Sequence, residues 1–305
     1  MTMNGRKRQE RAVNIVRSVA IIMVFLGFQP LLMSPKVMGG SEPKVSVSSR
    51  NIPQGDLGLI RVEVGKGEIP QVTWMGEKVH MVPNDQERTW RGFLGVDLKA
   101  KPGTYPLYVE ILPAGGEKNT EIHVEQKRYG VRRLTLPREM VALDAPTLER
   151  VKEEARTMRA LWEAPASIAA WSGPFLRPVE GEVVGPFGRS SIINEQPRTP
   201  HSGVDLRADR GTPIKAINDG RVALTCDHFF SGRSVVIDHG GGILSMYFHL
   251  EKILVQKDEK VTKGQVVGLV GSTGRATGPH LHFGIRVNGA RVDPLRLVSL
   301  SEDLE

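Results

Sequence analysis

The sequence lacks the features that mark several large classes of protein. A single cysteine, Cys226, occurs among its 305 residues, so a disulfide framework within the chain is excluded. Aromatic residues make up only 6% of the chain. The His-Glu-x-x-His motif, which joins two zinc ligands and a glutamate base on one helix, is absent. The 33 glycines and 20 prolines favour strands and turns over long helices.

Positive charge is concentrated at the start of the chain. The net charge is +7, and residues 1–40 contribute +5 of it, because they hold six basic residues against Glu10 alone. The other 265 residues are therefore nearly neutral, at +2, and they carry no nucleic-acid-binding motif. We predict that the protein has no nucleic-acid partner.

The basic start is followed by one apolar run. Residues 19–28 are apolar over about ten positions, and small residues follow at 39–41, which is the pattern of a secretory signal. The stretch 18–33 is short for a bilayer span, which takes about 20 apolar residues. Two interpretations of residues 1–40 stay open, a cleaved signal peptide and a retained membrane anchor. Both predict export to a periplasmic, cell-wall-associated or secreted location.

Residues 41–126 alternate short strand patterns with turns. The spacing of seven such segments predicts a β-sandwich, with an immunoglobulin-like arrangement as the nearest type. No chemistry is indicated in this region. The expected strands are 45–47, 59–64, 71–74, 79–82, 90–96, 105–111 and 120–124.

Residues 127–172 are predicted to be a linker with one helix. Apolar residues recur at helical spacing from Leu148 to Leu161, with charged residues between them. Asp144 or Thr147 is suited to cap the helix, and Pro165 is expected to end it. The helix is expected to dock on one of the β-rich regions that flank it.

Strand patterns return in residues 173–298 and predict an antiparallel β domain, followed by a short tail at 299–305. The predicted fold class is therefore mainly β. A polar loop at 189–199 directly precedes His201, and whether it covers the site stays open. The expected strands are 203–206, 212–217, 220–225, 234–238, 244–249, 265–269 and 280–287.

Six of the eight histidines lie in this last domain, and five of its polar residues stand out: His201, Asp205, His249, His280 and His282. On a strand, residues two or four apart share a face, so His201 is expected to face the same way as Asp205, and His280 the same way as His282. Val204, Leu281 and Phe283 would then point inward. Two imidazoles and one carboxylate, with further imidazoles beside them, are typical of a catalytic zinc site that keeps a position for water.

The other histidines are interpreted as structural. His80 and His123 lie on expected strands with no partner at ligand spacing. His239 is placed at a hairpin turn and His228 on a loop. A single histidine on a strand is usually a packing residue, so we predict no catalytic role for these four, and a place for His228 in the wall of the groove stays open.

Several motifs in the last domain occur together and in order. They are His201-Ser-Gly-Val-Asp205, Gly211-Thr-Pro-Ile214, Tyr247-Phe-His249-Leu250, Gly271-Ser-Thr-Gly274 and Gly278-Pro-His280-Leu-His282-Phe283. Over about residues 179–298 the chain resembles the lysostaphin/LytM-type zinc metallopeptidases, which are peptidoglycan endopeptidases. The resemblance implies that His201, Asp205 and His282 hold Zn²⁺, and that His249 and His280 are unliganded catalytic imidazoles.

The chemistry of amide hydrolysis agrees with this set of residues. The reaction needs a base for the attacking water and an acid for the leaving amine, and histidine titrates near neutral pH. His249 and His280 could divide or share these proton transfers, and the sequence leaves the division open, as it does the oligomeric state.

The leading hypothesis is an exported zinc-dependent endopeptidase that hydrolyses peptide cross-links of peptidoglycan, with stem or bridge peptides as its partners. Two alternatives stay open. One is a non-enzymatic wall-binding or regulatory module that keeps the peptidase fold. The other is a secreted metalloprotease that acts on proteins.

Overall fold

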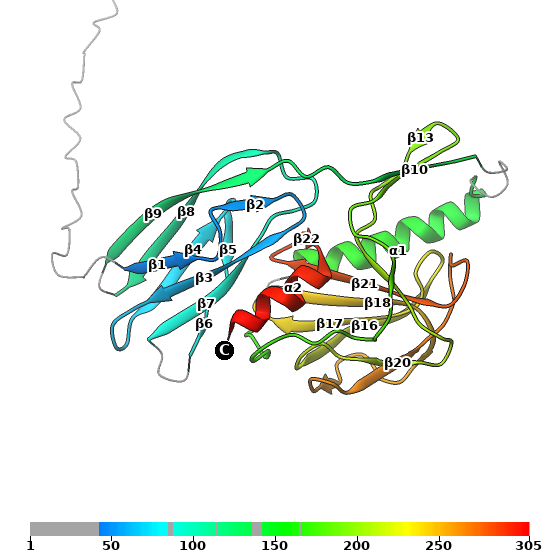
Figure 1. The fold of residues 1–305 in the computed structure, drawn as a ribbon. Coiled ribbons are helices and arrows are strands. Elements are labelled where there is room, and N and C mark those ends of the chain that lie inside the picture. Colours follow the sequence, from blue (N-terminus) through cyan, green and yellow to red (C-terminus); the bar gives the residue numbers. More distant parts are fainter. Residues whose placement is uncertain (1–42, 85–87, 114, 136–141, 165, 305) are drawn as a thin grey trace, which may run out of the picture. The chain divides into compact units, whose positions relative to one another are not determined.

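The computed structural model describes residues 43–84, 88–113, 115–135, 142–164 and 166–304. Contacts divide the chain into residues 1–36 and 37–305, and all described residues belong to the second unit. The expected signal or anchor at 1–40 lies outside the described residues. Within the described ranges, no helix combines the length and apolar character that crossing a bilayer requires. The mainly β fold class is confirmed (Figure 1).

Residues 44–125 form two sheets, with strand orders β1-β3-β7-β6 and β2-β9-β8-β4-β5. Apolar side chains from both sheets join one buried cluster, for example Ile60 on β3 and Leu107 on β8. Sequence reasoning missed β2, because asparagine and proline are poor strand formers. The strands are β1 (Lys44–Val47), β2 (Asn51–Pro53), β3 (Leu57–Glu63), β4 (Ile69–Trp74), β5 (Glu77–Val79), β6 (Val82–Pro83), β7 (Thr89–Gly95), β8 (Gly103–Leu112) and β9 (Gly116–Glu125).

A ten-stranded sheet occupies the C-terminal part, with the order β11-β14-β21-β18-β17-β16-β19 along its main path. The remaining strands β15, β20 and β22 pair beside this path. The strands are β11 (Val183–Gly185), β14 (Gly203–Arg207), β15 (Pro213–Lys215), β16 (Gly220–His228), β17 (Gly232–Gly240), β18 (Ile243–Ile253), β19 (Lys260–Val261), β20 (Val266–Val270), β21 (His280–Val287) and β22 (Ala290–Val292).

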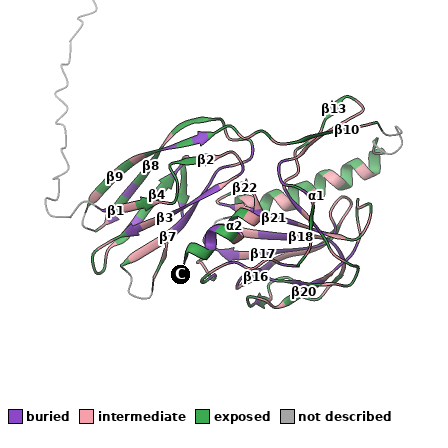
Figure 2. Ribbon diagram, in the orientation of Figure 1, coloured by how far each residue is buried: buried purple, intermediate pink, exposed green. Residues whose placement is uncertain are grey.

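Alternation along β14 and β21 sets which face carries the site. Val204, Leu281 and Phe283 are at most 2% exposed, so the inward-facing residues predicted from the pattern are confirmed. Figure 2 shows that much of β17 and β18 in the same sheet is also buried. Antiparallel pairing of β14 with β21 places Asp205 directly opposite His282. Side chains of opposed residues lie on one face, so the polar residues of both strands gather on the other side of the sheet from this core.

Helix α1 (Ala145–Glu163) agrees with the predicted helix, and Asp144 is its cap, since the carboxylate accepts from the N–H of Thr147 at 2.9 Å. None of its residues is fully buried, so the expected apolar docking face is only partly covered. Polar contacts hold the helix to the large sheet. Glu154 accepts from the N–H of Phe229 at 2.9 Å, and Arg150 donates to the carbonyl of Asp227 at 3.0 Å.

Two features were not anticipated. The loop before His201 forms the hairpin β12 (Ser190–Ile193) and β13 (Gln196–Pro197), which pairs in parallel with β10 (Val131–Leu134) of the linker. Near the C-terminus, α2 (Pro294–Ser301) and the short 3-10 helix η2 (Glu302–Leu304) follow β22, and they bury Leu300 and Leu304.

Candidate metal centre

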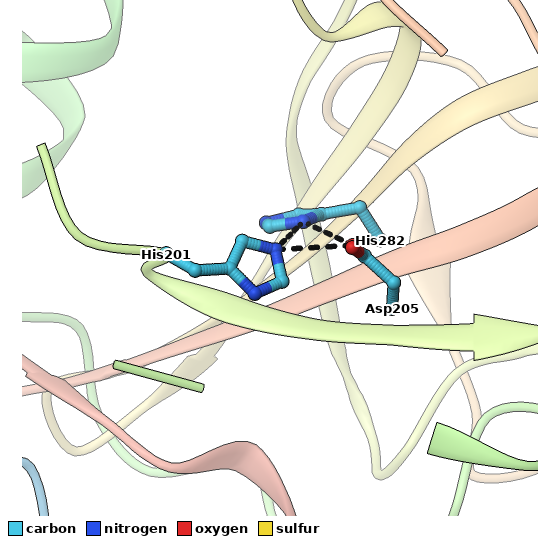
Figure 3. Close-up of side chains that lie close together, drawn as sticks. All are labelled: His201, Asp205 and His282. Atoms are coloured by element: carbon cyan, nitrogen blue, oxygen red, sulfur yellow. Dashed lines mark hydrogen bonds and ion pairs between the residues drawn. The ribbon is translucent and has the colours of Figure 1, made fainter. Parts of the chain in front are cut away.

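Three predicted ligands converge in the structure (Figure 3). Asp205 lies on β14 and His282 lies opposite it on β21. His201 lies just before β14, which begins at Gly203 as the expected strand did, so the alternation of side chains within the strand does not itself set the direction of His201. Its backbone N–H donates to the carbonyl of Arg189 at 3.0 Å, which fixes the approach to the strand.

The three ligand atoms form a nearly equilateral triangle. His201 Nε2 lies 2.9 Å from His282 Nδ1 and 3.1 Å from Asp205 Oδ1, and His282 Nδ1 lies 2.9 Å from the same oxygen. A tetrahedral zinc at about 2.0–2.1 Å from nitrogen and oxygen would separate its ligand atoms by about 3.3 Å. The residues present therefore fit the group that the pattern implies.

Hydrogen bonds prepare the ligands for a cation. The Nδ1 of His201 lies 3.0 Å from the carbonyl of Pro186. A carbonyl only accepts, so this nitrogen carries the proton and Nε2 offers its lone pair to the centre. The ring of His282 is stacked on that of Phe248, with centroids 5.3 Å apart and planes 7° apart, which fixes its orientation.

The electrostatics favour an ionised carboxylate at the centre of the site. Burial acts to raise the pKa of Asp205, but the close imidazoles of His201 and His282 outweigh burial and hold that pKa well below its usual range. Burial lowers the pKa of His282, against the opposing effect of the Asp205 carboxylate. One negative charge and two lone pairs directed at one point form a donor set for a divalent metal.

Two glycines leave room for the ligands. A Cβ on Gly185 of β11 would overlap the Oδ2 atom of Asp205, and a Cβ on Gly203 would lie 2.7 Å from His282 Nε2 and would overlap the carbonyl of Phe283. Sequence reasoning missed both glycines as parts of the site. The signal was present at Gly203, inside the motif between His201 and Asp205, but not at Gly185, which is distant in the chain.

His249 and His280 lie beside the three ligands. Their ring centroids are 4.8 Å apart, and the His249 ring lies 6.1 Å from that of His282. Each Nδ1 lies 2.9 Å from a carbonyl, that of Thr273 for His249 and that of Gly278 for His280. Each neutral ring is therefore protonated on Nδ1 and keeps a lone pair on Nε2.

The backbone of His249 is strained. Its φ is +67°, in the left-handed region that residues with a side chain seldom adopt. Its N–H donates to the carbonyl of Ser231 at 2.8 Å. Phe248 is paired with His282 across β18 and β21, so strict alternation would point His249 to the opposite face. The unusual φ breaks this alternation and lets the side chain of His249 face the site. Burial lowers its pKa to about 4.

The remaining histidines lie outside this cluster. His239 is fully buried on β17, its Nδ1 2.7 Å from the carbonyl of Asp219 and its Nε2 2.8 Å from the Ser245 hydroxyl, so it lies on a strand and not in a turn. His228 ends β16. His80 is half-buried, and the exposed His123 contacts the Thr104 hydroxyl at 2.7 Å.

Comparison with known proteins identifies the family of the C-terminal domain. Residues 199–294 match the model of peptidase family M23. The crystal structure of a Pseudomonas aeruginosa protein assigned to peptidase M23 is 31% identical, with a TM-score of 0.62, over 87% of this chain and 97% of that one. The chain belongs to peptidase family M23, a family of metallopeptidases. The matched residues of this chain, 199–294, include the three ligand residues together with His249 and His280.

Curated relatives match the same domain. The peptidoglycan DD-endopeptidase ShyA of Vibrio cholerae is 46% identical over 97 residues, which are 32% of this chain and 23% of that protein. The DD-carboxypeptidase/endopeptidase Mpg of Neisseria meningitidis is 39% identical over 104 residues, 34% of this chain and 24% of that protein. The match thus spans about a quarter of the length of these relatives.

Proposed function

We propose that the protein is an exported, zinc-dependent endopeptidase that hydrolyses peptide cross-links of peptidoglycan. The observation that carries this proposal is the triangle of His201, Asp205 and His282, with two further imidazoles beside it. The relatives named as peptidoglycan endopeptidases support the substrate class. Their name supports a bond between two D-residues as the one cleaved.

His201, Asp205 and His282 would hold the metal through Nε2, a carboxylate oxygen and Nδ1. Bound zinc supplies a water of lowered pKa and polarises the substrate carbonyl. The protein's own residues do the rest. Pro186 and Phe248 orient the two imidazole ligands, and Gly185 leaves space for the carboxylate.

His249 and His280 are proposed to move the protons. With Nδ1 donating to a backbone carbonyl, each ring can accept a proton at Nε2 and return it from the same atom. One transfer takes a proton from the attacking water, and the other gives a proton to the leaving amine. Having two such rings 4.8 Å apart lets the pair share both steps.

Digestion of purified wall fragments tests the proposal. We expect zinc-loaded protein to convert cross-linked muropeptides into monomers, with a chelator abolishing the reaction and added zinc restoring it. Mass spectrometry of the products identifies the bond cleaved. Wall binding without any cleavage by zinc-loaded protein would favour the non-enzymatic module, and faster cleavage of an unfolded protein substrate would favour the secreted protease.

The division of the chain is proposed on the same basis. Residues 173–298 would form the peptidase domain and residues 127–172 the helical linker. The shared cluster of the two sheets at 44–125 supports an immunoglobulin-like sandwich. Export through residues 1–40, by a cleaved signal or a retained anchor, follows from a wall substrate and is checked by sequencing the mature N-terminus.

A further inference from the structure

Two arginines lie on segments that lead into the candidate metal centre, and neither pairs with a carboxylate among the described residues. Arg198 lies three residues before His201, at the end of the β12–β13 hairpin, and its N–H donates to the carbonyl of Ser191 at 2.8 Å. Arg275 lies two residues after Thr273, whose carbonyl orients His249. Both arginines are therefore on segments that directly hold residues of the site.

Each guanidinium group is held in place on one side. That of Arg275 lies 4.2 Å from the centroid of the Phe230 ring, and its backbone N–H donates to the carbonyl of Phe230 at 2.9 Å. The Nε of Arg198 is buried and has no hydrogen-bond partner among the described residues. Buried donors are normally paired, so the described part of the protein leaves this guanidinium group incompletely satisfied.

The two positive charges act on each other. Burial lowers the pKa of Arg275, and the charge of Arg198 lowers it further. Among the described residues, neither arginine forms an ion pair, whereas the nearby Arg210 and Arg233 pair with Glu251 and Asp227. A pair of like charges without a counter-ion is unfavourable and is stabilised by an anion.

We propose that Arg198 and Arg275 bind a free carboxylate of the wall peptide, on the residue that supplies the leaving amine. This inference rests on the proposed function. A planar guanidinium matches a carboxylate through two parallel hydrogen bonds. When an amide joins two D-residues through the amino group of an α-carbon, that carbon also carries a carboxylate. This carboxylate is free both in a cross-link to a diamino acid and at a peptide terminus. The two arginines would therefore favour either of these peptides over one whose carboxylate is amidated.

Hydrolysis of matched substrates tests this assignment. The substrates are a cross-linked wall peptide and a linear peptide ending in two D-residues, each with the carboxylate free or amidated. For the free acids, we expect Arg198→Gln and Arg275→Gln to raise KM about 10- to 100-fold with kcat changed less, since bonds to charged groups are the strong ones. For the amidated peptides, the variants should match the unmodified protein. A response of one substrate only would identify the source of the carboxylate.

The control Arg221→Gln removes one positive charge from β16, where the side chain donates to the carbonyl of Asp258 at 2.7 Å, and should leave both KM values unchanged. Equal losses on acid and amide, or none, would overturn the assignment.

Binding separates this inference from the proposed function. The ligand is the hydrolysis product that carries the released amine and the free carboxylate beside it. This product is titrated into the zinc-loaded protein by calorimetry, and the same peptide with that carboxylate amidated serves as the comparison. We expect the acid to bind at least about 10-fold more tightly, and each arginine variant to remove that preference. If no substrate is hydrolysed but this preference holds, the enzyme proposal fails and the carboxylate site stands. Equal binding of acid and amide would reject the site even in an active enzyme.

Discussion

Two groups of polar residues on one sheet, one around His239 and one around His282, show how histidines serve different ends. Around His239, the side chains of His239, Ser245 and Tyr247 find their hydrogen-bond partners inside the protein. Its Nδ1 donates to the carbonyl of Asp219, its Nε2 accepts from Ser245, the Ser245 hydroxyl lies 3.0 Å from that of Tyr247, and the N–H of Ile217 donates to Tyr247. Around His282, by contrast, the lone pairs of three residues meet at one point. The side chains around His239 are fully buried, whereas His201, Asp205 and His282 are 12–22% exposed and direct their lone pairs at one point.

The largest expected effect comes from changing a proposed ligand. Asp205→Asn keeps the shape of the side chain but removes the negative charge that lies 2.9 Å from His282 Nδ1. We expect zinc content, measured by elemental analysis after desalting, to fall to background, and muropeptide hydrolysis to fall with it. One zinc per chain in the variant would contradict the assignment of Asp205.

Removing a proposed proton-transfer group should affect turnover while metal binding is kept. His280→Ala is expected to lower kcat by about 10²- to 10⁴-fold, the usual contribution of general acid–base catalysis. Zinc content should stay at the level of the unmodified protein. His228→Ala, outside the cluster on β16, is the matched control. Near-normal turnover of the zinc-loaded His280→Ala protein would remove His280 from the mechanism.

A change next to a ligand should have a smaller effect than loss of the ligand. In Gly185→Ala the new Cβ would overlap Asp205 Oδ2, so the carboxylate must move. We expect zinc affinity, measured by competition with a chelating dye, to fall by about 10- to 100-fold, as for other changes in the shell around a metal. Gly130→Ala meets no atom within 4 Å and should bind zinc normally. Equal affinities for the two variants would show that Gly185 does not position Asp205.

The smallest expected effect concerns stability in acid. Burial lowers the pKa of His239 to about 4, from 6.5 in the unfolded chain. Between pH 6.5 and pH 4 the unfolded state therefore binds a proton at His239 that the folded state does not bind. The free energy of unfolding has its full value above pH 6.5 and decreases as the pH falls toward 4. The loss corresponds to about 3 kcal/mol at most. Urea unfolding from pH 7 to pH 4 should show a shallower decline for His239→Gln.

The exposed His123→Gln provides the control for this measurement, because its decline should parallel that of the unmodified protein. Metal release in acid is common to all three proteins and cancels from the differences. If His239→Gln also declines in parallel, the buried imidazole does not carry the predicted pH dependence.

Local patterns anticipated much of the fold. The predicted helix and most strands agree with the structure because apolar periodicity and turn residues are local properties. Sequence reasoning missed β10 and β12, which pair across almost 60 positions of chain and carry no strong strand pattern. It also missed α2, whose Leu297 and Leu300 are buried only by tertiary packing.

The sequence alone determined which residue types could make a metal site, because Asp205, His280 and His282 sit at strand spacing within motifs that can be read directly. Only the tertiary structure decided how they meet. Register opposes Asp205 to His282, a left-handed φ turns His249 toward them, and Gly185, distant in the chain, leaves space for the carboxylate. Alternation is a property of each strand, whereas register, backbone strain and close approach depend on several strands packing together.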